Sequence, residues 1–166
     1  MTVGWAMAIL GVLTILQSTA LPRLPLLGVH PDVVLLAVLH WALLRGMREG
    51  LLWALVGGLW LDLLSGLPFG LSIISLILVA FLASLWEASL FREHISLIVL
   101  ATALLSVLHG GIYVALLRLT GHPAGSWSAF WRISMPTALY TSLLSPIMFA
   151  ALRWLDAATR REQLEW

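Results

Sequence analysis

The sequence predicts an all-α polytopic membrane protein with six transmembrane helices in a single domain, residues 1–166. Apolar residues make up 61% of the chain and charged residues only 10%, whereas about a quarter of a soluble domain is charged. The mean hydropathy of +1.00 points the same way. Apolar runs alternate with short segments of Pro, Gly and charged residues, so no loop is long enough to fold alone.

The composition also excludes several classes of function. The chain contains no Cys, so neither a disulfide framework nor a thiolate metal site is available. The formal net charge of +1 gives no reason to expect nucleic acid as a partner. No internal repeat is present that would indicate a solenoid.

The first three spans are expected at residues 3–21, 32–44 and 51–65. The first is long enough to cross roughly 30 Å of hydrocarbon. It lacks the basic region and cleavage site of a secretory signal, so we expect it to remain in the mature protein. Asp32 suits the first turn of the second span because its charge complements the helix dipole. A turn over residues 45–50 precedes the third span.

The remaining spans are expected at residues 71–90, 95–117 and 133–154. Residues 127–132 hold three aromatic side chains beside an arginine, which indicates a short interfacial segment. Two prolines in the last span predict kinks, and two serines close to the second proline can satisfy the carbonyl groups that it frees. These residues are Pro136, Pro146, Ser142 and Ser145.

The distribution of arginine predicts which side of the membrane holds the termini. Six spans place both termini on the same side, and that side carries more arginine than the other. The positive-inside rule therefore places both termini in the cytoplasm. The arginines on the side of the termini are Arg45, Arg48, Arg92, Arg153, Arg160 and Arg161, and those on the opposite side are Arg23, Arg118 and Arg132.

Within residues 46–70, every fourth position holds glycine, alanine or, at one position, Asp62. Residues four apart lie nearly above one another on a helix, so these positions form a shallow groove. Within a membrane, small residues let helix backbones approach closely. We therefore expect the groove to pack against another helix, either inside the protein or in a partner. Its residues are Gly50, Ala54, Gly58, Asp62 and Gly66.

Asp62 is the only acidic residue deep inside an expected span. A charge at that depth faces the protein interior, a wet cavity or a partner. A rise of about 1.5 Å per residue puts His109 at a similar depth. Asp62 and His109 are therefore expected to form an intramembrane polar pair, with Arg23 and Arg132 as rival partners. Asp62 is either a structural carboxylate satisfied by neighbouring helices or a group that serves transport or catalysis.

No catalytic, cofactor-binding or metal site is expected. Aspartyl intramembrane chemistry needs a second carboxylate close to the first, and Asp32 and Glu87 are expected near the two surfaces instead. Ser65 and His109 lack the Gly-x-Ser-Gly context of a rhomboid-like pair. The histidines show no i, i+4 spacing for a metal ion.

Three motifs lie between Pro31 and Gly70. They are the Pro31-Asp32 pair that opens a span, the Arg45-Gly46…Glu49-Gly50 hairpin, and the series Gly57-Gly58…Asp62…Gly66…Gly70. Together they resemble the MreD family, the rod-shape-determining membrane proteins of bacteria. The length, the six expected spans and the short loops agree with this family over the whole chain.

The resemblance implies a non-enzymatic scaffold of the cell-elongation complex, in the bacterial cytoplasmic (inner) membrane and without a cofactor. It implies binding to MreC, and support of peptidoglycan synthesis and rod shape. Further implied partners are the RodA glycosyltransferase with its class B penicillin-binding protein, MreB filaments and membrane lipid. The implied fold is similar to the substrate-binding components of energy-coupling-factor transporters.

A vitamin-type substrate-binding component of an energy-coupling-factor transporter is the alternative function. In that case Asp62 and His109 would line a solute cavity with apolar walls and a few convergent polar groups. A third class, the intramembrane hydrolases, is disfavoured because the necessary pairs of catalytic residues are missing.

Overall fold

The computed structural model describes residues 2–19, 30–66, 68–85, 95–121 and 127–161. Within these residues the regular elements are six helices and no strand, which confirms the all-α prediction for this part of the chain. The helices are α1 (Thr2–Thr19), α2 (Val33–Arg45), α3 (Met47–Ser65), α4 (Leu71–Ser84), α6 (Ile95–Leu119) and α7 (Trp127–Arg161).

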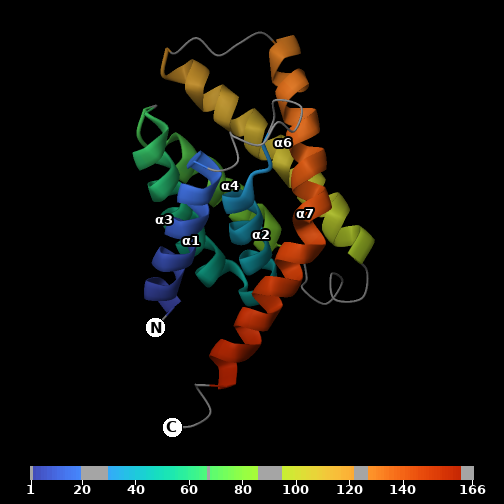
Figure 1. The fold of residues 1–166 in the computed structure, drawn as a ribbon. Coiled ribbons are helices and arrows are strands. Elements are labelled where there is room, and N and C mark those ends of the chain that lie inside the picture. Colours follow the sequence, from blue (N-terminus) through green and yellow to red (C-terminus); the bar gives the residue numbers. More distant parts are fainter. Residues whose placement is uncertain (1, 20–29, 67, 86–94, 122–126, 162–166) are drawn as a thin grey trace.

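Helix α2 lies at the centre of the bundle, with α1 and α3 on one side and α7 on the other, while α6 crosses obliquely from the lower right to the upper left (Figure 1). Every residue from Val34 to Leu43 is buried. This is possible because apolar side chains cover almost the whole circumference of the helix, and such a helix is stable in a surrounding of other helices. α2 accordingly contacts each of the other described helices.

The turn between α2 and α3 consists of Gly46 alone. Its φ of 83° lies in the left-handed region, which glycine adopts without the steric penalty of a Cβ atom. Its N–H donates to the Ala42 carbonyl at 2.9 Å and so closes the end of α2. The turn is therefore shorter than the expected residues 45–50, and Gly50 lies inside α3.

Successive helices run in opposite directions, and α1 begins and α7 ends toward the lower end of Figure 1. Helix α7 is one element from Trp127 to Arg161, so residues 127–132 are its first turns rather than a separate segment. The helix continues through Pro136 and Pro146 without interruption. Residues 86–90 of the expected fourth span lie outside the described residues.

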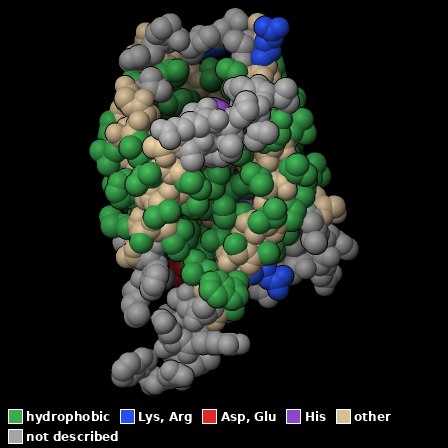
Figure 2. Space-filling model, viewed as in Figure 1, with side chains coloured by type: hydrophobic (Ala, Val, Ile, Leu, Met, Phe, Trp, Pro, Cys, Tyr) green, Lys and Arg blue, Asp and Glu red, His purple; other side chains and the backbone are tan. Residues whose placement is uncertain are grey.

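The surface has the apolar character expected for contact with lipid. Two helices, Ser96–Leu119 and Phe130–Ala157, are long and apolar enough to cross a membrane. Figure 2 shows hydrophobic side chains over the middle of the visible face and basic side chains near its upper and lower ends. An apolar zone between ends that carry basic side chains agrees with the chemistry of a bilayer.

Candidate functional site

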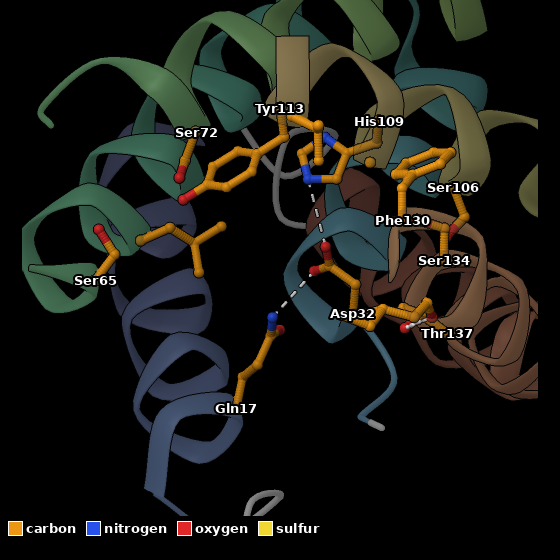
Figure 3. Close-up of a pocket in the computed structure, with 14 residues that line it drawn as sticks. Gln17, Asp32, Ser65, Ser72, Ser106, His109, Tyr113, Phe130, Ser134 and Thr137 are labelled. Atoms are coloured by element: carbon orange, nitrogen blue, oxygen red, sulfur yellow. Dashed lines mark hydrogen bonds and ion pairs between the residues drawn. The ribbon is translucent and has the colours of Figure 1, made fainter. Parts of the chain in front are cut away.

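A cavity of about 340 Å³ lies at the end of the bundle where α1 and α3 end and where α2, α4 and α7 begin. Helix α6 lines it with residues between Ser106 and Val114. Because the helices alternate in direction, residues distant in the sequence meet at this end (Figure 3). The polar side chains that line the cavity include Gln17, Asp32, Ser72, Ser106, His109 and Tyr113.

Asp32 holds the beginning of α2 in place. Its Oδ1 accepts hydrogen bonds from the Leu35 N–H at 3.0 Å and from Gln17 Nε2 at 3.1 Å, so Asp32 is the N-cap of α2. Gln17 Oε1 in turn accepts from the Val34 N–H at 3.0 Å. The Asp32 N–H donates to Thr141 Oγ1 at 3.0 Å. These contacts join α1, α2 and α7 at the cavity.

His109 pairs with Asp32. Its Nε2 lies 3.5 Å from Asp32 Oδ2, and the two side chains are 12% and 16% exposed (Figure 3). The expected partner, Asp62, faces α4 instead. Of the rival partners expected for Asp62, Arg132 is exposed on α7 and Arg23 lies outside the described residues.

Asp62 lies in the last turns of α3 and binds the beginning of α4. Its Oδ2 accepts from the Gly70 N–H at 2.8 Å and from the Ile73 N–H at 3.4 Å, and its Oδ1 accepts from the Ser72 N–H at 2.9 Å. The first amides of a helix have no partner within the helix and favour an anion. This arrangement corrects the expected pairing with His109, because backbone amides take up the carboxylate.

Most of the groove on α3 is filled by neighbouring helices of the same chain. A Cβ atom at Gly50 would lie 2.5 Å from a Cβ atom of α2, and one at Gly58 would lie 2.5 Å from Ile73 Cα of α4. Ala54 is fully buried. Gly66 differs, since it ends α3 in the left-handed region and is exposed. Of the two expected uses of the groove, these contacts favour internal packing.

A buried polar cluster that the sequence does not predict lies at the centre of the bundle. His40 Nδ1 donates to the Leu36 carbonyl at 2.7 Å, so Nε2 of the neutral ring accepts from the Ser145 hydroxyl at 2.8 Å. Ser145 Oγ also lies 2.9 Å from Thr102 Oγ1. Ser145 therefore links α2, α6 and α7 and does not serve the carbonyl groups freed by Pro146.

A charged cluster joins α2, α3 and α7 at the opposite end of the bundle from the cavity. Arg45 Nε donates to Asp156 Oδ1, and Arg45 Nη1 lies 3.6 Å from Glu49 Oε1. Trp41 Nε1 donates to Glu49 Oε2 at 3.1 Å, and the Trp41 ring stacks on Trp53 with centroids 4.3 Å apart. These aromatic and charged groups are typical of a membrane–water interface.

The described structure does not bring Ser65 and His109 together as a catalytic pair. Ser65 donates to the Asp62 carbonyl at 3.3 Å, and in Figure 3 Ser65 lies apart from His109, with Tyr113 between them. No group of three or more His, Asp or Glu side chains in the described part of the chain could hold a metal ion.

The family model described as rod shape-determining protein MreD matches residues 1–155. The chain belongs to the MreD family. Members of this family are structural membrane proteins with a role in the determination of rod shape. The chain matches none of the curated proteins and none of the solved structures with which it was compared.

The residues that resemble the MreD family hold the helices of the bundle in place. Asp32 caps α2, Gly46 makes the turn to α3, and Gly58 allows α3 and α4 to touch. Asp62 binds the first amides of α4, which Gly70 precedes with a φ of 103°. This MreD chain therefore uses its most characteristic segment to fix the positions of α2, α3 and α4.

Proposed function

We propose that this MreD chain is a non-enzymatic scaffold of the cell-elongation complex. In this role it binds MreC in the bacterial inner membrane and through MreC acts with RodA, its class B penicillin-binding protein and MreB filaments. Membership of the MreD family is the observation that carries the proposal.

The proposal includes six spans with both termini in the cytoplasm. Alternating helix directions and the apolar surface support it. The excess of arginine at the end that holds Arg45 and Arg153 supports this orientation. The cavity beside Asp32 then faces the periplasmic side.

We further propose that the transmembrane helix of MreC docks on a lipid-facing surface. The α3 groove is already occupied at Gly50 and Gly58, so a helix from another chain cannot enter there. Large apolar side chains remain exposed on several helices, for example Leu63 of α3, Leu104 of α6 and Leu143 of α7. Each of these positions is available for contact with a partner helix.

Co-purification from the native membrane tests the scaffold function. A tagged chain, solubilised in mild detergent, is expected to bring down MreC in a stable ratio, as measured by mass spectrometry. Photo-crosslinking residues at Leu63, Leu104 and Leu143 then report which surface contacts MreC. Cells that lack the protein are expected to become round. Rod-shaped cells without it, together with no recovery of MreC, would refute the proposal.

A substrate-binding component of an energy-coupling-factor vitamin transporter is the second candidate. The cavity favours it, since about 340 Å³ with apolar walls and a few polar groups is typical of a small-molecule site. His109 lines this cavity, whereas the Asp62 carboxylate is engaged by the amides of α4. Co-purification of an ATPase coupling module in place of MreC would support this candidate.

A further inference from the structure

The cavity beside Asp32 has the dimensions and walls of a site for one small organic molecule. Its volume of about 340 Å³ lies at the lower end of the range for ligand pockets. Apolar and aromatic side chains cover much of the wall, among them Leu61, Val114, Phe130 and Ile133. Figure 3 shows polar groups of Asp32, His109 and Tyr113 among them. The cavity therefore suits a molecule with an apolar body and a polar end.

The charge of the wall limits what that polar end can be. Asp32 is the only Asp, Glu, Lys or Arg among the described residues that line the cavity. No arginine of the described lining is present to bind a phosphate or a carboxylate. An anion would meet the Asp32 carboxylate and be repelled, whereas a cation would be attracted.

Asp32 also has hydrogen-bonding capacity left on the oxygen that faces His109. Its Oδ1 already accepts from Leu35 and Gln17. The contact of its Oδ2 is with His109 Nε2, at 3.5 Å, beyond the usual 2.7–3.2 Å of an N–H···O hydrogen bond. A carboxylate has about four acceptor positions, so Oδ2 can accept a further N–H donor at ordinary distance.

Two aromatic rings of the wall favour a cation as well. Tyr113 and Phe130 both line the cavity, and the Tyr113 hydroxyl points toward Ser72 (Figure 3). The face of an aromatic ring attracts an ammonium group electrostatically, and more strongly where water is excluded. Tyr113 and Phe130 thus add aromatic surface to the wall of the cavity that Asp32 also lines.

We propose that this cavity binds a small organic cation with an ammonium group and an apolar or aromatic body. The ammonium group donates to Asp32 Oδ2, and the body contacts Tyr113, Phe130 and Val114. The proposed cation site and the proposed binding of MreC are independent of each other.

Three probes of similar shape and different charge test the proposal on the purified full-length chain in lipid nanodiscs. They are phenethylamine, 2-phenylethanol and 3-phenylpropionate, and binding is measured by calorimetry and by the shift in Tm. Phenethylamine is expected to bind more tightly than the alcohol by about tenfold or more, and the acid is expected not to bind. Equal affinity for the three probes, or tighter binding of the acid, would overturn the proposal without any variant.

Two variants locate the site. Asp32→Asn removes the charge but keeps a residue that caps helices well, and it is expected to weaken phenethylamine binding about tenfold or more. Val114→Phe is expected to fill the cavity and abolish binding. Glu49→Gln, which changes a carboxylate at the opposite end of the bundle, is the matched control and should bind as wild type. Wild-type affinity in both cavity variants would place the probe elsewhere and refute the assignment.

Discussion

Gly58 of α3 lies directly against the backbone of Ile73 of α4. A Cβ atom at Gly58 would lie 2.5 Å from Ile73 Cα and 2.8 Å from its backbone nitrogen. Backbone atoms cannot move aside as the end of a flexible side chain can, so even a methyl group would force the two helices apart. Lipid tails are as apolar as the helix surfaces, so no hydrophobic driving force brings two helices together in a membrane. Close backbone contact of this kind stabilises their association instead.

Gly58→Ala is accordingly expected to destabilise the protein by about 1–3 kcal/mol, the usual cost of overpacking. Thermal unfolding in detergent, followed by circular dichroism, measures the effect. Gly4→Ala is the matched control, because no atom lies within 4 Å of the added Cβ atom. A Tm of Gly58→Ala equal to that of Gly4→Ala would contradict the contact.

Asp62→Asn is expected to lower stability by about 1–3 kcal/mol, since an amide offers one acceptor oxygen where the carboxylate binds three backbone N–H groups with two. Insertion into the membrane should remain intact. Protease resistance and Tm of the purified variant measure the loss. Ser18→Ala serves as the control, because the Ser18 hydroxyl is exposed and bonds within its own helix. If Asp62→Asn were as stable as Ser18→Ala, the capping role would be refuted.

Ser145→Ala is expected to cost about 1–3 kcal/mol, because His40 Nε2 would remain buried without its donor. Thr102→Val should destabilise the protein less, since valine has nearly the shape of threonine and Ser145 keeps its hydrogen bond to His40. The double variant should be less destabilising than the sum of the two single changes, because both act on one network. Strict additivity of the unfolding free energies would show that the cluster does not act as a unit.

Arg45 and Asp156 are expected to be coupled. Both side chains are largely buried, at 11% and 15% exposure, and removal of one partner from such a pair leaves a charge without compensation. A double-mutant cycle with Arg45→Met and Asp156→Asn should give an interaction energy of about 0.5–3 kcal/mol. Arg153→Met provides a comparison, since its guanidinium lies over the Phe149 ring instead. A coupling energy near zero would show that the pair does not hold α2 to α7.

The orientation in the membrane can be measured directly because the chain contains no Cys. Single cysteines at Phe69 and Met47 replace side chains that are 64% and 45% exposed; Met47 begins α3, and Phe69 lies in the turn between α3 and α4 at the other end of the bundle. A membrane-impermeant maleimide applied to intact spheroplasts should label Phe69→Cys, and should label Met47→Cys only after permeabilisation. The reverse pattern would place both termini outside the cytoplasm.

The apolar runs and the Gly, Pro and charged residues between them are sufficient to predict most helix boundaries. The apolar run and Asp32 predicted the start of α2 to within one residue. The turn to α3 was predicted too long, because composition does not reveal that Gly46 alone can reverse the chain. Arg48 and Glu49 suggested a loop by their polarity, although both lie in α3 at the expected level of the interface.

Polar partners were harder to predict than helices. Asp62 was recognised as a group that needs compensation, but its partners are backbone amides of α4, which no side-chain pattern identifies. The pair of His40 and Ser145 spans 105 positions in the sequence, so it depends on which helices are neighbours. The cavity arises in the same way, from helix ends that converge only in the folded chain.

The binding of the α4 amides by Asp62 has a consequence for biogenesis. Before α3 and α4 pack together, the Asp62 carboxylate in the last turns of α3 and the first amides of α4 both have to be satisfied by water at the membrane surface. Each helix supplies the hydrogen-bonding partner that the other helix lacks. The translocon should therefore release α3 and α4 laterally as a preformed hairpin, and a ribosome stalled between them should leave α3 retained at the insertion machinery.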